Sequence, residues 1–287
     1  MIDQGHRLWG RAKSMVLDSG MSEPPKLSSK EKYLAGETTA ICERHGEFEV
    51  QSVDLVGHLM VQGKCGKCVG EFHDAIEEQI KLLLRKEEEE TFRDAMKSSG
   101  VSERHFERSF DTYVADTKEK KYALDSMKYF AEKVIEGECK NMILCGSVGT
   151  GKTHLCNALI RHLLEHNVHM NVLIATITQM IRFYRSSWNK DNELSEEEAI
   201  GHLSKVKLLV IDELGVQVGS DNELNIIFEI INNRYEKRLP TVIISNLEKS
   251  EVVNLLGTRI IDRLKEDGCR VLGMNWESHR ETNKESF

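Results

Sequence analysis

The segment Gly146–Thr153 carries the clearest chemical signal in the chain. It reads GSVGTGKT and matches the pattern G-x-x-x-x-G-K-[ST] in full, between the apolar run MILC and the periodic run HLCNALIRHLL. Glycines let backbone N–H groups turn toward a phosphate, a lysine at this place reaches the β- and γ-phosphates, and the final hydroxyl binds Mg²⁺. A chance glycine-rich turn explains a complete match between a strand and a helix poorly. We therefore expect the phosphates of ATP to be bound by Gly146, Ser147, Val148, Gly149, Thr150, Gly151, Lys152 and Thr153.

Two adjacent acidic residues supply the other half of this chemistry. The segment Leu208–Glu213 reads LLVIDE, an apolar strand that ends in two carboxylates. Asp212 is expected to hold Mg²⁺ together with Thr153, and Glu213 to orient and polarise the attacking water. The pair predicts hydrolysis of ATP to ADP and phosphate, with Glu213 and Lys152 as catalytic residues.

Short apolar runs alternate with amphipathic stretches from residue 141 onward. Apolar strands that alternate with helices indicate an α/β fold, in which helices cover both faces of a parallel sheet. The expected strands are 142–145, 171–175, 208–211, 241–244 and 270–273, and the clearest helices are 154–165 and 222–237.

The N-terminal part holds two pairs of metal-binding residue types. Cys42-x-x-His45 and Cys65-x-x-Cys68 have the spacing of two tight knuckles, and four such ligands suit one tetrahedral Zn²⁺. A closed four-ligand site leaves no position for a reactive water, so we expect a structural zinc site in a module that serves docking. The arrangement looks like a zinc ribbon.

The chain is expected to have three parts. Residues 1–70 form an N-terminal arm and the zinc-binding module, and the weak pattern of residues 1–40 predicts a mobile or loosely packed arm. Residues 71–100 form a linker helix, because apolar residues recur at helical spacing there. Residues 101–287 form the ATPase domain.

Composition limits the partners and the compartment. The chain has 287 residues, 40% of them hydrophobic, with a formal charge of −8 and a pI of about 5.8. This acidic balance argues against a protein that coats duplex DNA by charge alone, although it leaves room for a local basic groove. No apolar run approaches the roughly 20 residues of a membrane span, and the N-terminus has no secretory signal. We therefore expect a cytoplasmic protein with reduced thiols and no membrane partner.

Features beyond the phosphate loop resemble the AAA+ class of P-loop ATPases. Asn246 ends the fourth expected strand, where the AAA+ layout implies a polar sensor 1 residue that contacts the γ-phosphate or its attacking water. By itself an asparagine there is an ordinary strand-end turn residue. Only the segment NWESHRETNKESF follows the last expected strand, and we expect it to be too short for the helical lid that usually follows this core.

Two arginines resemble the pair found in the initiator and loader group of that class. Arg259 and Arg263 are four residues apart and therefore share one helix face. The resemblance implies that one of them, Arg263 before Arg259, projects into the ATP site of a neighbouring subunit, so that activity requires self-assembly. The alternative is an exposed pair bound to Asp262 or Glu266.

Several longer segments resemble the DnaC/IstB-type ATPases, and the DnaC-type helicase loaders especially. These segments, within residues 104–280, are HFERSFDTY, LSKVKLLVIDELGVQ, LLGTRIIDRL and NWESHR. The resemblance implies a protein that binds a DnaB-type replicative DNA helicase and delivers it onto single-stranded DNA under the control of ATP. The N-terminal part departs from the cellular DnaC pattern, and a zinc ribbon on such a core resembles phage or prophage replication proteins.

The resemblance also implies an added helix between the second expected strand and the strand that ends in the two acidic residues, and this helix contacts single-stranded DNA in the family. The corresponding segment here is TITQMIRFYRSSWNK. Its apolar residues repeat at helical spacing and fit a core stripe, whereas Arg182, Arg185 and Lys190, with aromatic neighbours, fit contacts to phosphates and bases. Both interpretations remain open at this point.

Two other functions compete with the helicase loader. An IstB-like helper of DNA transposition shares the ATPase core but acts on duplex DNA, and the acidic net charge argues against it. A nucleotide-gated adaptor with little turnover would use ATP binding alone as its signal. A preference for single-stranded over duplex DNA would distinguish a helicase loader from a transposition helper. A Glu213→Gln variant would distinguish a loader from an adaptor, because a hydrolytic cycle should stall in the ATP-bound complex whereas an adaptor should behave normally.

Overall fold

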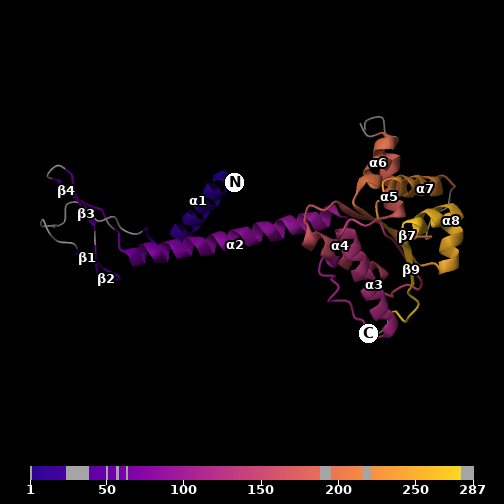
Figure 1. The fold of residues 1–287 in the computed structure, drawn as a ribbon, viewed down its shortest axis with the longest axis horizontal. Coiled ribbons are helices and arrows are strands. Elements are labelled where there is room, and N and C mark those ends of the chain that lie inside the picture. The colour runs from indigo at the N-terminus through magenta and orange to yellow at the C-terminus, as the bar shows by residue number, and fades with distance from the viewer. Residues whose placement is uncertain are drawn as a thin grey trace, which may run out of the picture. The chain divides into compact units, whose positions relative to one another are not determined.

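The computed structural model describes residues 2–23, 39–49, 51–55, 58–62, 64–187, 195–215 and 221–278. The chain divides into two compact units, Met1–Glu90 and Thr91–Phe287. The long helix α2, Gly66–Ser98, contributes residues to both units. Figure 1 shows the elements of each unit.

The first unit contains two small antiparallel ribbons that precede α2. Strands β1 (Thr39–Cys42) and β2 (Gly46–Glu49) form one ribbon. Strands β3 (Gln51–Leu55) and β4 (His58–Gln62) form the other. Cys42 ends β1 and His45 lies in the turn before β2, while Cys65 directly precedes α2 and Cys68 lies in its first turn, so these elements position the metal site.

A helix forms in the first part of the segment that was expected to be a mobile or loosely packed arm. Helix α1 spans Ile2–Asp18, and its Ala12 and Val16 are buried against Ile76 and Leu83 of α2. The expectation was wrong for these residues because the apolar stripe of α1 is narrow, and a single narrow stripe gives little helical stability until it packs on a partner. The apolar face of α2 supplies that partner.

The second unit is built on one parallel sheet of five strands. The strand order is β6-β7-β8-β5-β9, and every neighbouring pair is parallel. This confirms the predicted α/β fold. Four of the five strands lie within one residue of their expected bounds, and β7 continues three residues beyond its expected end. The strands are β5 (Asn141–Cys145), β6 (Val172–Thr176), β7 (Leu208–Leu214), β8 (Thr241–Ser245) and β9 (Cys269–Gly273).

Helices cover both faces of this sheet (Figure 1). Strand β5 shows the two faces directly, because Met142 and Leu144 belong to one hydrophobic cluster and Ile143 and Cys145 to the other. The first cluster contains α3 (Lys118–Ile135) and α4 (Lys152–His166). The second contains α5 (Ile177–Ser186), α6 (Glu196–Lys205), α7 (Asp221–Glu236) and α8 (Lys249–Glu266).

A buried arginine fixes the end of the sheet opposite the phosphate loop. The Arg234 side chain is 0% exposed, and its guanidinium donates to Thr241 Oγ1 at 3.0 Å and to the carbonyl oxygens of Val206 and Pro240 at 2.9 and 2.6 Å. Burial lowers the pKa of Arg234 to about 9. The side chain thereby ties the end of α7 to the starts of β7 and β8.

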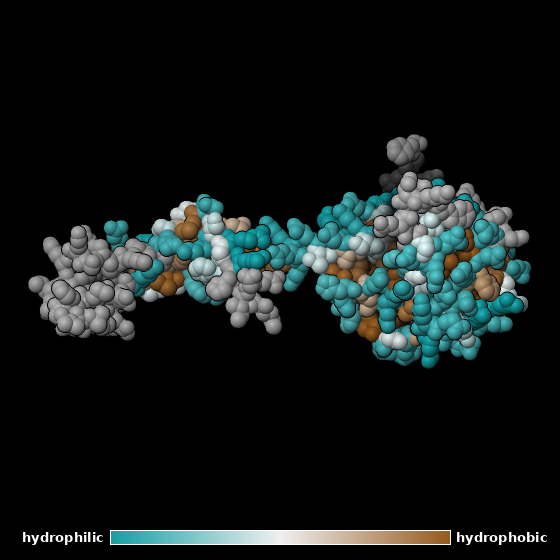
Figure 2. All heavy atoms as spheres, turned by 90° about the horizontal axis from the view of Figure 1, so that it is seen from above, coloured by the Kyte–Doolittle hydropathy of each residue, from teal (hydrophilic) through white to brown (hydrophobic). Residues whose placement is uncertain are grey.

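No helix among the described residues is long and apolar enough to cross a lipid bilayer. The face of the second unit that Figure 2 shows is mostly hydrophilic, with hydrophobic residues visible in small groups.

Candidate ATP site and metal site

The phosphate loop lies between β5 and α4, as predicted. Gly146 follows β5, and its N–H donates to the Leu247 carbonyl at 3.0 Å. Gly151 precedes α4 with a φ of 94°, a left-handed conformation that favours glycine. Lys152 Nζ lies over the loop and donates to the carbonyl oxygens of Gly146 and Ser147 at 2.7 and 2.6 Å. Burial lowers the pKa of Lys152.

The two acidic residues lie on an irregularity of β7. Ile211 pairs with Ile243 and Leu214 with Ser245, and the register shifts between these pairs. Such a bulge changes the direction in which side chains project. Glu213 has a φ of 62°, which is unusual for a residue with a side chain and is typical of functional sites.

This local geometry separates the environments of the two carboxylates. Asp212 is half-buried, and its Oδ1 accepts from the Glu213 N–H at 2.7 Å while its Oδ2 lies 3.5 Å from Thr153 Oγ1. Burial raises the pKa of Asp212. Glu213 is exposed. The Asp212 carboxylate therefore lies beside the Thr153 hydroxyl, in a position from which the two groups could bind one magnesium ion. The neighbouring Glu213 carboxylate is exposed to solvent.

A cleft of about 870 Å³ gathers these residues in the second unit. Its lining includes Val148–Thr153 of the loop, both carboxylates and Asn246. Gly146 and Ser147 are not among the residues that line the cleft, and Asn246 is exposed directly after β8. Parallel strands end at the same edge of a sheet, which is why motifs distant in sequence meet there. The volume is large enough for a nucleotide.

The cleft also contains residues that the motifs did not reveal. Tyr113 is 9% exposed, packs against Gly151, and has no hydrogen-bond partner for its buried hydroxyl among the described residues. Burial raises the pKa of Tyr113 to about 12. Arg108 and Trp276 line the same cleft. Only the quoted segments HFERSFDTY and NWESHR marked these places in the sequence, without assigning a role to any residue in them.

The two arginines lie away from this cleft. Helix α8 is broken at Gly257, whose φ and ψ are 74° and 160°, and both arginines follow the break. Arg259 is exposed, and neither arginine is among the residues that line the cleft. The Arg263 guanidinium lies 5.6 Å from the ring centre of Phe228 and 5.7 Å from that of Tyr235.

The segment with the proposed DNA contacts is mainly a packing element. Ile177, Met180 and Ile181 of α5 are buried, so its apolar stripe belongs to the core. Arg182 is exposed, while Arg185 pairs with Glu223 at 3.1 Å. The predicted contact residue Lys190 lies outside the described residues.

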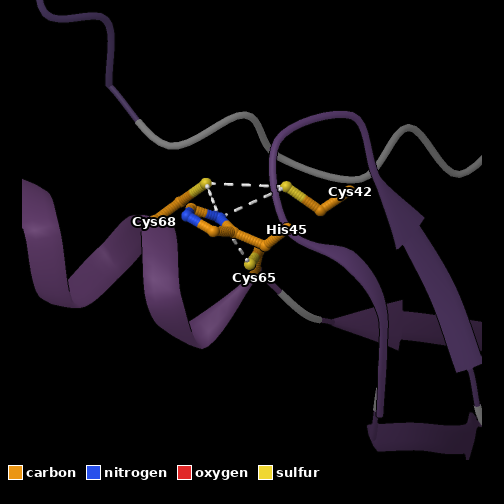
Figure 3. Close-up of side chains that lie close together, drawn as sticks. All are labelled: Cys42, His45, Cys65 and Cys68. Atoms are coloured by element: carbon orange, nitrogen blue, oxygen red, sulfur yellow. Dashed lines mark hydrogen bonds between the residues drawn. The ribbon is translucent and has the colours of Figure 1, made fainter.

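The structure brings the four predicted metal ligands together in the first unit (Figure 3). His45 Nδ1 lies 3.7 Å from Cys42 Sγ, 3.5 Å from Cys65 Sγ and 3.2 Å from Cys68 Sγ, and all four ligand atoms lie within 4.8 Å of one another. Three sulfurs and one imidazole nitrogen at these separations fit a tetrahedral Zn²⁺.

Neighbouring groups favour the metal-binding form of Cys42 and orient the ring of His45. A backbone hydrogen bond from Arg44 is the largest of the effects that lower the pKa of Cys42, to about 6, which favours the thiolate that binds metal. The other ring nitrogen of His45, Nε2, lies 3.0 Å from a carboxylate oxygen of Glu71, and Arg44 holds the second oxygen at 2.9 Å. A carboxylate in this place fixes the orientation of a metal-binding histidine.

Comparison with known proteins agrees with the geometry of the cleft. The sequence profile of the IstB-like ATP binding proteins matches residues 71–286. The replicative helicase loader DnaC of Buchnera aphidicola subsp. Baizongia pistaciae is 32% identical over 198 residues, which cover 69% of this chain and 79% of that protein. DnaC of Escherichia coli (strain K12) is 33% identical over 182 residues, which cover 63% of this chain and 73% of that protein.

Solved structures show the same fold. The crystal structure of the DnaC helicase loader matches with a TM-score of 0.53 and 22% identity, and the match covers 61% of this chain and 100% of that one. The crystal structure of DnaI matches with a TM-score of 0.50 and 20% identity, over 62% of this chain and 94% of that one. Together with the length of the family match, these findings show that the chain belongs to the IstB/DnaC-like family of P-loop ATP-binding proteins.

Proposed function

We propose that this protein is an ATP-hydrolysing loader that binds a replicative DNA helicase and delivers it onto single-stranded DNA. The observation that carries the proposal is the 32% identity over 198 residues with a replicative helicase loader DnaC, in a chain whose cleft holds both ATP motifs. The identity covers most of that relative, so the proposal rests on the whole ATP-binding unit and not on the phosphate loop alone.

Different residues of the cleft are assigned to different parts of ATP hydrolysis. Lys152 and the backbone N–H groups of Val148–Thr153 are assigned to the phosphates of ATP, because they surround the end of the loop before α4. Glu213 is assigned as the general base that takes a proton from the attacking water, since it lines the cleft and its side chain is exposed there. Asn246 is assigned to the γ-phosphate or the attacking water.

The residues present fit one Mg²⁺. Thr153 Oγ1 and Asp212 Oδ2 lie 3.5 Å apart, and hydroxyl and carboxylate oxygens are the ligands that this ion prefers. When bound, Mg²⁺ would neutralise charge on the β- and γ-phosphates. Thr153 and Asp212 would hold the ion, directly or through water, and Glu213 would accept the proton of the attacking water.

The arginines after the break in α8 are assigned to a neighbouring subunit. Neither lines the cleft of its own chain, so a role in ATP hydrolysis requires a second copy. Arg263 remains the first candidate and Arg259 the second, although Arg263 also packs on two aromatic rings. Mixing a Glu213→Gln chain with an Arg263→Ala chain tests this assignment, because only mixed assemblies contain an intact site and recover activity.

The first unit is assigned to docking through its zinc module. Its four ligands would fill the tetrahedral positions around a zinc ion and would leave none open for catalysis. Exposed Arg182 and Phe183 of α5 are assigned to single-stranded DNA, because a cation beside an aromatic ring suits phosphate and base together.

Co-purification with the replicative helicase of the host tests the loader function. The wild type is expected to form a complex with ATP present and to start unwinding of coated single-stranded DNA. Lys152→Ala is expected to lose loading, and Lys128→Ala, a change of an exposed lysine on α3, is the matched control. Failure to bind the helicase, combined with tight binding to duplex DNA, would overturn the proposal in favour of a transposition helper.

A further inference from the structure

The segment after β9 lies directly against the phosphate loop. The Met274 N–H donates to the Cys145 carbonyl at 2.7 Å, immediately before the loop. The Trp276 indole N–H donates to the Thr150 carbonyl at 3.0 Å, near the other end of the loop. Residues Met274–Ser278, here called the clasp, therefore contact the loop at both ends.

Glycine positions in the loop show how close this contact is. A Cβ atom at Gly146 would overlap Asn275 Oδ1 and the Met274 carbonyl, and one at Gly149 would overlap the Ser278 side chain. The phosphate-loop pattern requires glycine at position 146 but leaves position 149 open. The glycine at 149, with a φ of 82°, is explained by the clasp and the left-handed backbone together.

Asn275 connects the loop to another element. Its Oδ1 accepts from the Ser147 N–H at 3.2 Å, and its Nδ2 donates to Glu248 Oε2 at 3.1 Å. Glu248 is the N-cap residue of α8, and its own N–H donates to Glu251 Oε2 at 2.8 Å. One amide group thus joins the phosphate loop to the beginning of α8, ahead of the break at Gly257 that precedes Arg259 and Arg263.

The amide is the side-chain group that fits both neighbours. The Ser147 N–H needs an acceptor and the Glu248 carboxylate needs a donor, and an asparagine supplies one of each in fixed geometry. An aspartate of the same shape would keep the acceptor but place its charge against Glu248. Aspartate at position 275 and glutamine at position 248 together would restore the complementary pair.

We propose that Asn275 is a positioning residue that couples the phosphate loop to α8, so that ATP bound at the loop orders the part of this helix before its break at Gly257. This inference rests on the proposed ATP function of the cleft and adds to it a route by which the site acts on α8. Ser147 is the contact on the loop, and Glu248 is the contact on the helix.

The first test measures ATP binding to the full-length protein by equilibrium dialysis, together with KM and kcat for ATP. Asn275→Asp is expected to weaken ATP binding and raise KM roughly fivefold, with a smaller change in kcat, since it replaces one exposed hydrogen bond by repulsion. Adding Glu248→Gln is expected to restore most of the affinity. Asn254→Asp, an exposed asparagine on α8, is the matched control and should bind ATP like the wild type.

The second test measures hydrogen exchange of the first turn of α8 with and without ATP. The wild type is expected to gain protection there on ATP binding, whereas Asn275→Asp should gain it only in the phosphate loop. Equal protection of α8 in both proteins, no ATP effect on α8 in the wild type, or no rescue by Glu248→Gln would overturn the coupling. Absence of ATP binding by the wild type would instead overturn the proposed function of the cleft.

Discussion

The Thr153 hydroxyl lies 3.5 Å from Asp212 Oδ2, although 59 positions separate the two residues in the sequence. Strand β5, which precedes the loop and Thr153, and strand β7, which contains Asp212, are not neighbours, because β8 lies between them. The contact is made by the first turn of α4, which rises from the loop over the edge of the sheet where β7 ends. The sheet topology and the first turn of α4 together bring these two proposed magnesium ligands into contact.

Replacing Glu213 by glutamine is expected to uncouple ATP binding from hydrolysis. The variant keeps shape and hydrogen-bonding capacity but has no base, so kcat should fall by roughly 10²- to 10⁴-fold. The dissociation constant for ATP should stay within about twofold, because Glu213 is exposed and is assigned no phosphate contact. Glu236→Gln, an exposed glutamate on α7, is the control. Unchanged turnover in Glu213→Gln would contradict the assignment.

Replacing Asp212 by asparagine is expected to stabilise the fold while abolishing magnesium-dependent hydrolysis. Burial raises the pKa of Asp212, so the folded state holds its proton more tightly than the unfolded state, and the ionised form destabilises the protein at neutral pH. The gain in Tm without nucleotide should be largest above the raised pKa. It should disappear as the pH falls through that pKa to the ordinary aspartate range of about 4. Thermal melts at several pH values measure this, and a Tm gain independent of pH would contradict it.

Removing the zinc site is expected to affect the first unit without affecting ATP binding. The four ligand atoms lie within 4.8 Å of one another in the unit Met1–Glu90, whereas the cleft lies in the other unit. The wild type should contain about one zinc per chain by elemental analysis, since one tetrahedral site takes one ion. Cys65→Ser should lose the zinc and unfold the first unit at lower temperature, and Cys269→Ser should retain it. Zinc retained by Cys65→Ser would argue against the site.

Replacing Tyr113 by phenylalanine is expected to stabilise the fold and to weaken ATP binding. The Tyr113 hydroxyl is buried without a partner among the described residues and lines the cleft. Its removal should raise the free energy of unfolding without nucleotide by up to about 1 kcal/mol, because an unsatisfied buried polar group is costly. ATP binding should weaken by roughly three- to tenfold if the hydroxyl bonds to the nucleotide. Calorimetric titration measures the affinity, and equal affinity would make the hydroxyl irrelevant to ATP.

Much of the fold and of both sites was predictable because it depends on local pattern. The segment Gly146–Thr153 is one continuous motif, and the acidic pair Asp212 and Glu213 is a second one. Each knuckle of the metal site likewise holds two ligands within four residues. The strands of the sheet are short apolar runs with few alternatives. Such features are encoded by neighbouring residues, so they need no knowledge of what they pack against.

Other features exist only through contacts between distant segments. Helix α1 packs on α2 through a stripe too narrow to identify alone, and Tyr113 and Asn275 reach the phosphate loop from before and after the sheet. The bulge that sets Asp212 and Glu213 in different environments arises from pairing with β8. Contacts between residues that are distant in sequence depend on strand order and helix placement, which no single segment specifies. For this reason the contacts of Tyr113 and Asn275 with the phosphate loop could be recognised only in the folded structure.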